Sequence, residues 1–227
     1  MIRTLTVLSC LLIIACNTGK RITSADELYT APQEWPVKIN DGWFSAKTFA
    51  YGPYTTSSRK NGIADAMAVN FIKAPQQPYN FTVSGKEENL LVQILNTQRA
   101  AFTNRPLPSY LAGEANSAPL FYALINGTKN NPLQRWELIL KNSTYLDLNN
   151  NKTAGILRSP DIDIRITAHN RFGKTNSYEK ICYEFQYRGQ PVAAVIPGSK
   201  PQLWVSKHID AEIEKILAAA IGALLFR

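Results

Sequence analysis

The chain has 227 residues, of which 45% are hydrophobic and 19% are charged, and its formal net charge is +8. This composition is that of an ordinary globular protein with one sizeable core, and no low-complexity tract or Gly/Ser linker marks a second domain. The Lys and Arg residues are scattered without a run of five like charges, which excludes a basic nucleic-acid-binding arm and indicates a solvated basic surface. Attraction to an anionic membrane surface is the alternative interpretation of the charge.

The first predicted element is a secretory signal. One positive charge at Arg3 precedes an apolar run from Leu5 to Ala15, and the run ends at Cys16. A run of about eleven apolar residues has the length of a signal-peptide core and is too short for a transmembrane helix, which needs about 20. Residues 1–15 are therefore predicted to be a cleaved signal peptide.

Residues 13–16, Ile-Ile-Ala-Cys, resemble the lipobox of bacterial lipoproteins. The resemblance implies that the Cys16 thiol receives a diacylglycerol, that cleavage precedes Cys16, and that its new amino group takes a further acyl chain such as palmitate. Two or three acyl chains would anchor the protein firmly, since one chain binds only marginally. Asn17, in place of Asp, follows the lipidated Cys, and the resemblance to sorting rules in some Gram-negative bacteria implies the periplasmic face of the outer membrane. A plain cleaved signal or a buried apolar terminus is the alternative, and Cys10 fits the motif less well.

Cysteine usage agrees with this interpretation. If Cys10 leaves with the signal and Cys16 is acylated, only Cys182 remains, so no intramolecular disulfide is possible. Cys182 lies in a strand-like stretch, which predicts a buried and inert thiol.

Residues 16–34 are predicted to be a polar tether followed by a short helix over 24–29. Ser24 and Glu27 have the spacing of a capping box, and Pro32 and Pro36 end the helical pattern. A single domain is predicted over 35–227.

Aromatic and β-branched residues then recur in short runs separated by Gly, Asn and Pro, which predicts a succession of strands. The predicted strands are 43–51, 54–60, 65–73, 79–84, 89–97, 119–126, 134–141, 153–158, 161–168, 181–188, 191–197 and 202–207. Asn61-Gly62 and Arg188-Gly189 are predicted hairpin turns. Residues 149–152 are predicted to be a loop, and 100–118 either a long loop or a short helix.

The last predicted element is a helix over 209–226. Acidic residues lie near its start, and from Ile216 to Phe226 it has no polar side chain. A surface helix has a polar stripe, so this helix is expected to be buried on every side. Its eleven apolar residues are too few to cross a bilayer, which takes about 20.

About a dozen strands followed by one buried helix predict a mainly β protein, a closed antiparallel β-barrel around the hydrophobic C-terminal helix. A barrel of eight strands has room only for side chains, whereas about eleven strands can hold a helix along the axis. A β-sandwich with the C-terminal helix packed on it is the alternative.

The stretch 183–196 forms a predicted hairpin that leads through Leu203-Trp204-Val205 and Asp210 into this helix. That series resembles the end of the tubby-like barrels, the group that includes tubby proteins, phospholipid scramblases and LURP-one proteins. The resemblance implies a twelve-stranded barrel around a hydrophobic helix. It covers roughly the last 45 residues, and no phosphoinositide-binding motif accompanies it upstream.

The residues that carry chemistry form no recognisable site. Asp161 and Asp163 share one face of a strand and suit a metal, but isoleucines alternate with them, which favours a half-buried strand with a charged outer face. His169 and His208 have no partner at metal-ligand spacing. The tryptophans at 35, 43, 136 and 204 are interpreted as core residues. No catalytic, cofactor-binding or metal-binding residue is predicted, and Cys16 is the one predicted site of modification.

The sequence therefore predicts a lipid-anchored protein of the bacterial cell envelope, most simply a non-enzymatic binding or structural module at the periplasmic membrane face. Its expected partners are membrane lipid through acylated Cys16 and an envelope protein or lipid, without nucleic acid. The alternatives are a hydrolase with a cleft where Asp161, Asp163 or His169 converge, and a lipocalin-like carrier of a lipid or small ligand.

Overall fold

The computed structural model describes residues 27–30, 35–43, 45–64, 76–97, 105–115, 120–141, 152–173 and 180–227. The predictions for the signal peptide, Cys16, most of the tether and the strand at 65–73 lie outside these residues. The predicted loop at 149–152 lies outside them except for Lys152.

Thirteen antiparallel strands form one sheet, and two helices accompany it. The strands are β1 (Val37–Gly42), β2 (Ser45–Tyr51), β3 (Tyr54–Thr56), β4 (Lys60–Asn61), β5 (Gln76–Gly85), β6 (Glu88–Thr97), β7 (Leu120–Ile125), β8 (Trp136–Leu140), β9 (Thr153–Arg158), β10 (Asp163–His169), β11 (Cys182–Tyr187), β12 (Gln190–Ile196) and β13 (Gln202–Val205). The helices are α4 (Ser109–Ala115) and α6 (Ala211–Leu225).

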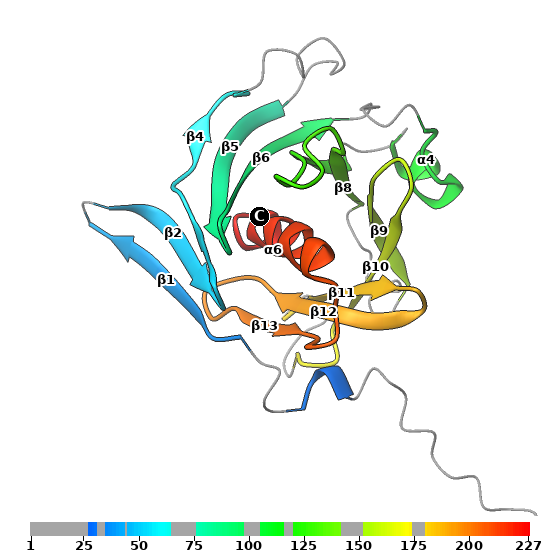
Figure 1. Cartoon of the computed structure of the whole chain (residues 1–227). Helices are drawn as coiled ribbons and strands as arrows, with labels where there is room; N and C mark the ends of the chain where they lie inside the picture. The colour runs from blue at the N-terminus through cyan, green and yellow to red at the C-terminus, as the bar shows by residue number, and fades with distance from the viewer. Residues whose placement is uncertain are drawn as a thin grey trace, which may run out of the picture.

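Each strand except β3 pairs with the next one along the chain, and the sheet curls into a nearly closed barrel around α6 (Figure 1). β3 and β4 both pair with β5, so together they occupy one place in the wall. The ends of the sheet meet where the Trp35 N–H donates to the Leu203 carbonyl at 2.8 Å. The predicted barrel of about twelve strands around a C-terminal helix is confirmed, and the alternative β-sandwich is not the architecture.

α6 is the centre of the core. Asp210 caps its N-terminus by accepting from the Glu212 and Ile213 N–H groups, and every residue from Ile216 to Phe226 is buried. This stretch has no polar side chain, so the surrounding wall removes the whole helix surface from water. Within the described residues, no helix has both the length and the apolar character needed to cross a membrane.

The wall lies close to α6 at Gly222. A Cβ at this position would lie 2.9 Å from the Tyr51 hydroxyl and 3.2 Å from Phe81. The Tyr51 hydroxyl donates to the Ala218 carbonyl at 2.8 Å, which gives a fully buried polar group its partner. Phe226 packs against the Phe81 ring with centroids 4.7 Å apart. This side of the helix is sealed.

Two segments cover the outside of the wall. Residues 105–115, including α4, lie over the strands around β8 and β9, where Arg158 forms a buried ion pair with Glu137 at 2.8 Å. The Arg158 guanidinium also donates to the Pro106 carbonyl, so it fastens this segment to the wall. On the opposite side Leu28 packs against a cluster that includes Trp204.

The observed elements differ from the predicted ones in few places. β1 was not predicted, because Asn40-Asp41-Gly42 indicates a turn and leaves only three strand-like residues ahead of it. The prediction of a hairpin turn at Asn61-Gly62 is wrong. Asn61 belongs to β4 and pairs with Tyr79 of β5, and the Gly62 N–H donates to the Pro78 carbonyl, so both residues continue along β5. Residues 100–118 contain the short helix α4.

The Arg188-Gly189 hairpin is confirmed. Tyr187 pairs with Gln190, and both turn residues have positive φ angles, as a two-residue hairpin turn requires.

Candidate functional site

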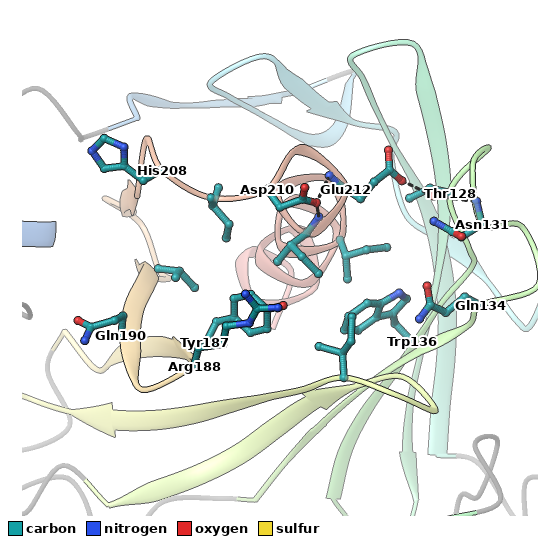
Figure 2. Close-up of a pocket in the computed structure, with 15 residues that line it drawn as sticks. Thr128, Asn131, Gln134, Trp136, Tyr187, Arg188, Gln190, His208, Asp210 and Glu212 are labelled. Carbon is teal, nitrogen blue, oxygen red and sulfur yellow. Dashed lines mark hydrogen bonds between the residues drawn. The ribbon is translucent and has the colours of Figure 1, made fainter.

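The barrel has two ends, which we call the mouth and the base. α6 begins at the mouth directly after its N-cap Asp210, and it ends at the base, where Phe226 and Arg227 follow it. A cavity of about 550 Å³ opens at the mouth beside the first turns of α6 (Figure 2). Its lining consists of Thr128, Asn131, Gln134, Trp136, Ile162, Tyr187, Arg188, Gln190, Val192, His208, Ile209, Asp210, Glu212, Ile213 and Ile216.

The cavity exists because polar contacts hold the start of α6 toward one side of the barrel. Glu212 accepts from the Thr128 hydroxyl and the Asn130 amide, both at 2.6 Å. Glu214 accepts from Lys86 at 2.8 Å. These partners lie in the β5–β6 turn and the β7–β8 loop, and α6 packs most closely on β6 and β7. Space therefore remains between α6 and the opposite wall.

The acidic groups beside the cavity already have partners. Lys215 bonds to Glu212 at 2.8 Å and, together with Thr128, holds the pKa of the Glu212 carboxyl below its usual range. The Asp210 carboxylate is used as the helix cap. The positive end of the helix dipole is thus met by the protein's own carboxylates and offers no anion site.

The floor and sides of the cavity are apolar. Trp136 of β8, Val192 of β12 and Ile213 of α6 are exposed by 3%, 9% and 6%, and Ile162 lies beside them. These side chains come from elements far apart in the sequence and meet only because the wall closes around α6. The surface they present suits an apolar ring or chain.

The rim opposite Glu212 is polar, and its cation is Arg188. The positive φ of Arg188 places it at the tip of the β11–β12 hairpin, with its guanidinium 5.1 Å from the centroid of the Tyr187 ring. Figure 2 shows Tyr187, Arg188 and Gln190 on one side of the cavity, with Thr128 and Asn131 on the other. No described carboxylate forms an ion pair with Arg188, so its charge is available to a ligand.

Asp161 and Asp163 do not enter this cavity. Both are exposed, and Asp163 makes a bidentate contact with Arg105 at 2.7 and 2.9 Å. Ile164 and Ile166 are fully buried, which confirms a half-buried strand with Asp163 on its charged outer face. Asp161 lies in the bend before β10 and not on the strand as predicted.

His169 and Cys182 face each other across β10 and β11, outside the barrel wall. Over them lies Tyr29, whose hydroxyl is 2.5 Å from Glu184 Oε2, 3.4 Å from His169 Nε2 and 3.8 Å from Cys182 Sγ. His169 is about 20 Å along β10 from Asp163, so these two groups do not converge.

The cluster under Tyr29 docks a chain segment and contains no activated nucleophile. Burial raises the pKa of the Cys182 thiol to about 12, which keeps it protonated, as predicted for an inert thiol. Burial, with Arg171 nearby, lowers the pKa of His169 to about 4. The sequence offered no signal for the pairing of Tyr29 with Glu184, which are 155 positions apart.

The tryptophans divide between core and surface. Trp136 and Trp204 are buried, as predicted, but Trp43 is 95% exposed in the turn between β1 and β2. The interpretation of Trp43 as a core residue is therefore wrong, because it falls in the turn and not in a strand. His208 is exposed at the rim of the cavity.

Among the described residues, no three His, Cys, Asp or Glu side chains are arranged to hold a metal ion. Comparison of the chain with family models, curated proteins and solved structures finds no match. The function is therefore argued from the geometry of the chain itself.

Proposed function

We propose that this protein is a lipid-anchored binding module of the bacterial cell envelope, and that its ligand is a small amphipathic anion held in the mouth cavity. The single observation that carries this proposal is the cavity itself. It combines a floor of buried apolar side chains with one unpaired guanidinium at its rim.

The size and chemistry of the cavity support a small molecule. A volume of about 550 Å³ lies within the roughly 300–1,000 Å³ of typical ligand sites, which are mostly apolar with a few placed polar groups. An apolar chain would lie against Trp136, Val192 and Ile213, and its carboxylate or phosphate would reach Arg188. Glu212 and Asp210 also line the cavity, but each carboxylate already accepts hydrogen bonds within the protein, Glu212 from Thr128 and Asp210 from the helix N–H groups.

The anchor is supported by the sequence at residues 13–16. The first strand of the barrel begins at Val37, so residues 17–36 would separate the barrel wall from acylated Cys16. The most economical location is the periplasmic face of the outer membrane. The proposed role is to bind and present a ligand there without transforming it.

A fluorescent fatty acid tests the binding site. Dansylamino-undecanoate has an apolar chain and a carboxylate, and energy transfer from Trp136 to its dansyl group would report occupation of the cavity. We expect binding that saturates, loss of most of the transfer in Trp136→Phe, and weaker binding in Arg188→Gln. Val192→Phe should fill the cavity and abolish binding.

Arg171→Gln is the matched control, because Arg171 is also an exposed arginine stacked on aromatic rings but lies outside the wall. Its affinity should equal that of the parent protein. Equal binding by the parent and Val192→Phe would refute the cavity as the site. Labelled fatty acid incorporated equally into the parent and Cys16→Ser would refute the anchor.

A further inference from the structure

Among the described residues, positive charge exceeds negative charge more at the base of the barrel than at the mouth. β9 and β11 begin at the base and β12 ends there, so the residues just outside these strand ends lie at that end of the molecule. Arg59 and Arg227 lie at the same end, since Arg59 stacks on the Phe226 ring at 5.7 Å. The exposed cations of the described base include Arg59, Lys60, Lys152, Arg171, Lys180 and Lys200.

Few described acidic groups balance them. Glu27 and Asp41 are the exposed acids of the described base. At the mouth, by contrast, more of the described cations meet acids, as Lys86 meets Glu214 and Lys215 meets Glu212, although Arg188 has no such pair. Among the described residues, the excess of cations over acids is therefore larger at the base than at the mouth, which composition alone does not show.

Trp43 lies at the same end. β1 pairs with β2 so that Val37 and Tyr51 are toward the mouth, and the turn at Gly42 and Ser45 is toward the base. Figure 1 shows this hairpin extending away from the barrel wall. Its indole is 95% exposed, which is unusual for a side chain with such a large apolar surface. Tryptophan is the residue that prefers the boundary between water and a bilayer.

The chain also leaves the domain toward the amino terminus at the base. Leu28 and Tyr29 pack with Ile196, the last residue of β12, and with Cys182, the first residue of β11. Glu27 is eleven positions from Cys16, a reach of at most about 40 Å. If Cys16 is acylated, as the proposed function holds, the membrane lies on this side of the barrel.

We infer that the base of the barrel is a membrane-facing surface that rests on anionic phospholipid, with Trp43 in the interfacial layer and the exposed lysines and arginines over the headgroups. This inference rests on the proposed lipid anchor. Its consequence is that the mouth cavity points away from the bilayer and stays open to solutes. The base supplies orientation, and the acyl chains supply attachment.

The test uses the full lipidated protein in vesicles whose acyl chains carry bromine, which quenches tryptophan fluorescence at short range. Vesicles of phosphatidylcholine alone are compared with vesicles that also contain phosphatidylglycerol. We expect stronger quenching with phosphatidylglycerol and its loss in Trp43→Phe. Trp136→Phe, which removes an indole at the mouth, should keep the quenching.

Charge reversal at the base provides the second arm. The double variant Lys152→Glu/Lys200→Glu should lose the extra quenching that phosphatidylglycerol produces. Lys207→Glu is the matched control, because Lys207 is also exposed but follows β13 at the mouth. The inference would be overturned if the quenching were lost in Trp136→Phe. It would also be overturned if the quenching were the same with and without phosphatidylglycerol and unchanged in the Lys152→Glu/Lys200→Glu variant.

Flotation with phosphatidylcholine vesicles separates the two proposals. Neutral vesicles report attachment through Cys16 alone, so a parent protein that fails to float with them contradicts the anchor. If such a protein still floats with phosphatidylglycerol vesicles and loses this in Trp43→Phe, the membrane-facing base is supported without the anchor. Flotation with both vesicles and no quenching at Trp43 contradicts the base and leaves the anchor in place.

Discussion

The sealed half of the barrel and its open mouth are built on the same helix and use it differently. Around Gly222 the wall packs against α6, and even the Tyr51 hydroxyl donates a hydrogen bond to the helix backbone at Ala218. Around Ile213 the helix is held by polar groups on one side only, and the other side borders a cavity. The comparison shows that one apolar helix can form both the core of the barrel and one wall of a binding site, provided that its first turns are held to one side of the barrel axis.

We expect the largest loss of stability when a charge is placed in the sealed half of the barrel. Ala219 is fully buried, so Ala219→Glu would bury a carboxylate without a partner or force it to stay protonated. The expected cost is several kcal/mol, a large share of the roughly 5–15 kcal/mol by which a domain is stable. Circular dichroism and thermal melting should show an unfolded or insoluble protein.

The matched control is Ala211→Glu, which places the same side chain on the exposed first residue of α6. A negative charge at a helix N-terminus is favourable, so the melting temperature should not fall. Removal of residues 210–227 should prevent folding as Ala219→Glu does. A cooperative β-type melt of either disrupted protein would contradict a barrel that depends on its central helix.

The two histidines extend the comparison to pH, since His169 is buried near the base and His208 is exposed at the mouth. Because the folded-state pKa of His169 is lowered to about 4 from an ordinary value of about 6.5, the unfolded chain binds the proton more tightly. The contribution of this group to stability is complete above about pH 6.5 and is lost as the pH falls toward 4. The full loss is up to about 3 kcal/mol.

Urea unfolding at pH 7 and pH 4.5 measures this loss. His169→Gln should remove part of the destabilisation at the lower pH, whereas His208→Gln should leave it unchanged. An identical pH dependence in the parent and His169→Gln would show that the histidine is not buried in its neutral form.

Added volume distinguishes the two halves by packing alone. Gly222→Val should cost about 1–3 kcal/mol, because its side chain would collide with Tyr51, Phe81 and Val83. Val192→Ile adds one methylene beside the cavity and should cost less than about 1 kcal/mol. Thermal melting of the two variants measures the contrast. Equal destabilisation would mean that the mouth is as tightly packed as the base.

The smallest expected effect concerns Asp161 and Asp163 on the outer surface of the barrel. Asp161→Asn and Asp163→Asn should each change stability by at most about 1 kcal/mol, because the carboxylates are exposed. The larger of the two changes should be at Asp163, which contacts Arg105 through both oxygens. Urea midpoints measure this, and calorimetry with a divalent cation should show no binding that the double variant loses.

The sequence alone determined the parts of the fold that depend on local patterns. The apolar stretch from Ile216 to Phe226 has no polar face, and this required a helix surrounded by protein. The alternation of apolar and polar side chains predicted β10, and Arg188-Gly189 predicted the turn between β11 and β12. Both depend on the local preferences of neighbouring residues. The helix and the number of strands together led to the barrel.

Only the tertiary structure decided where the cavity and the docked segments lie. The mouth cavity depends on Glu212 meeting Thr128 and Asn130, more than eighty positions away, and Tyr29 finds Glu184 across a still longer separation. The exposure of Trp43 also became clear only in the tertiary structure, since it depends on β1, a strand that the sequence did not predict. Local periodicity states which face of a segment is buried, but the partner that buries it is chosen by the closure of the sheet, because contacts between distant residues form only once the wall surrounds α6.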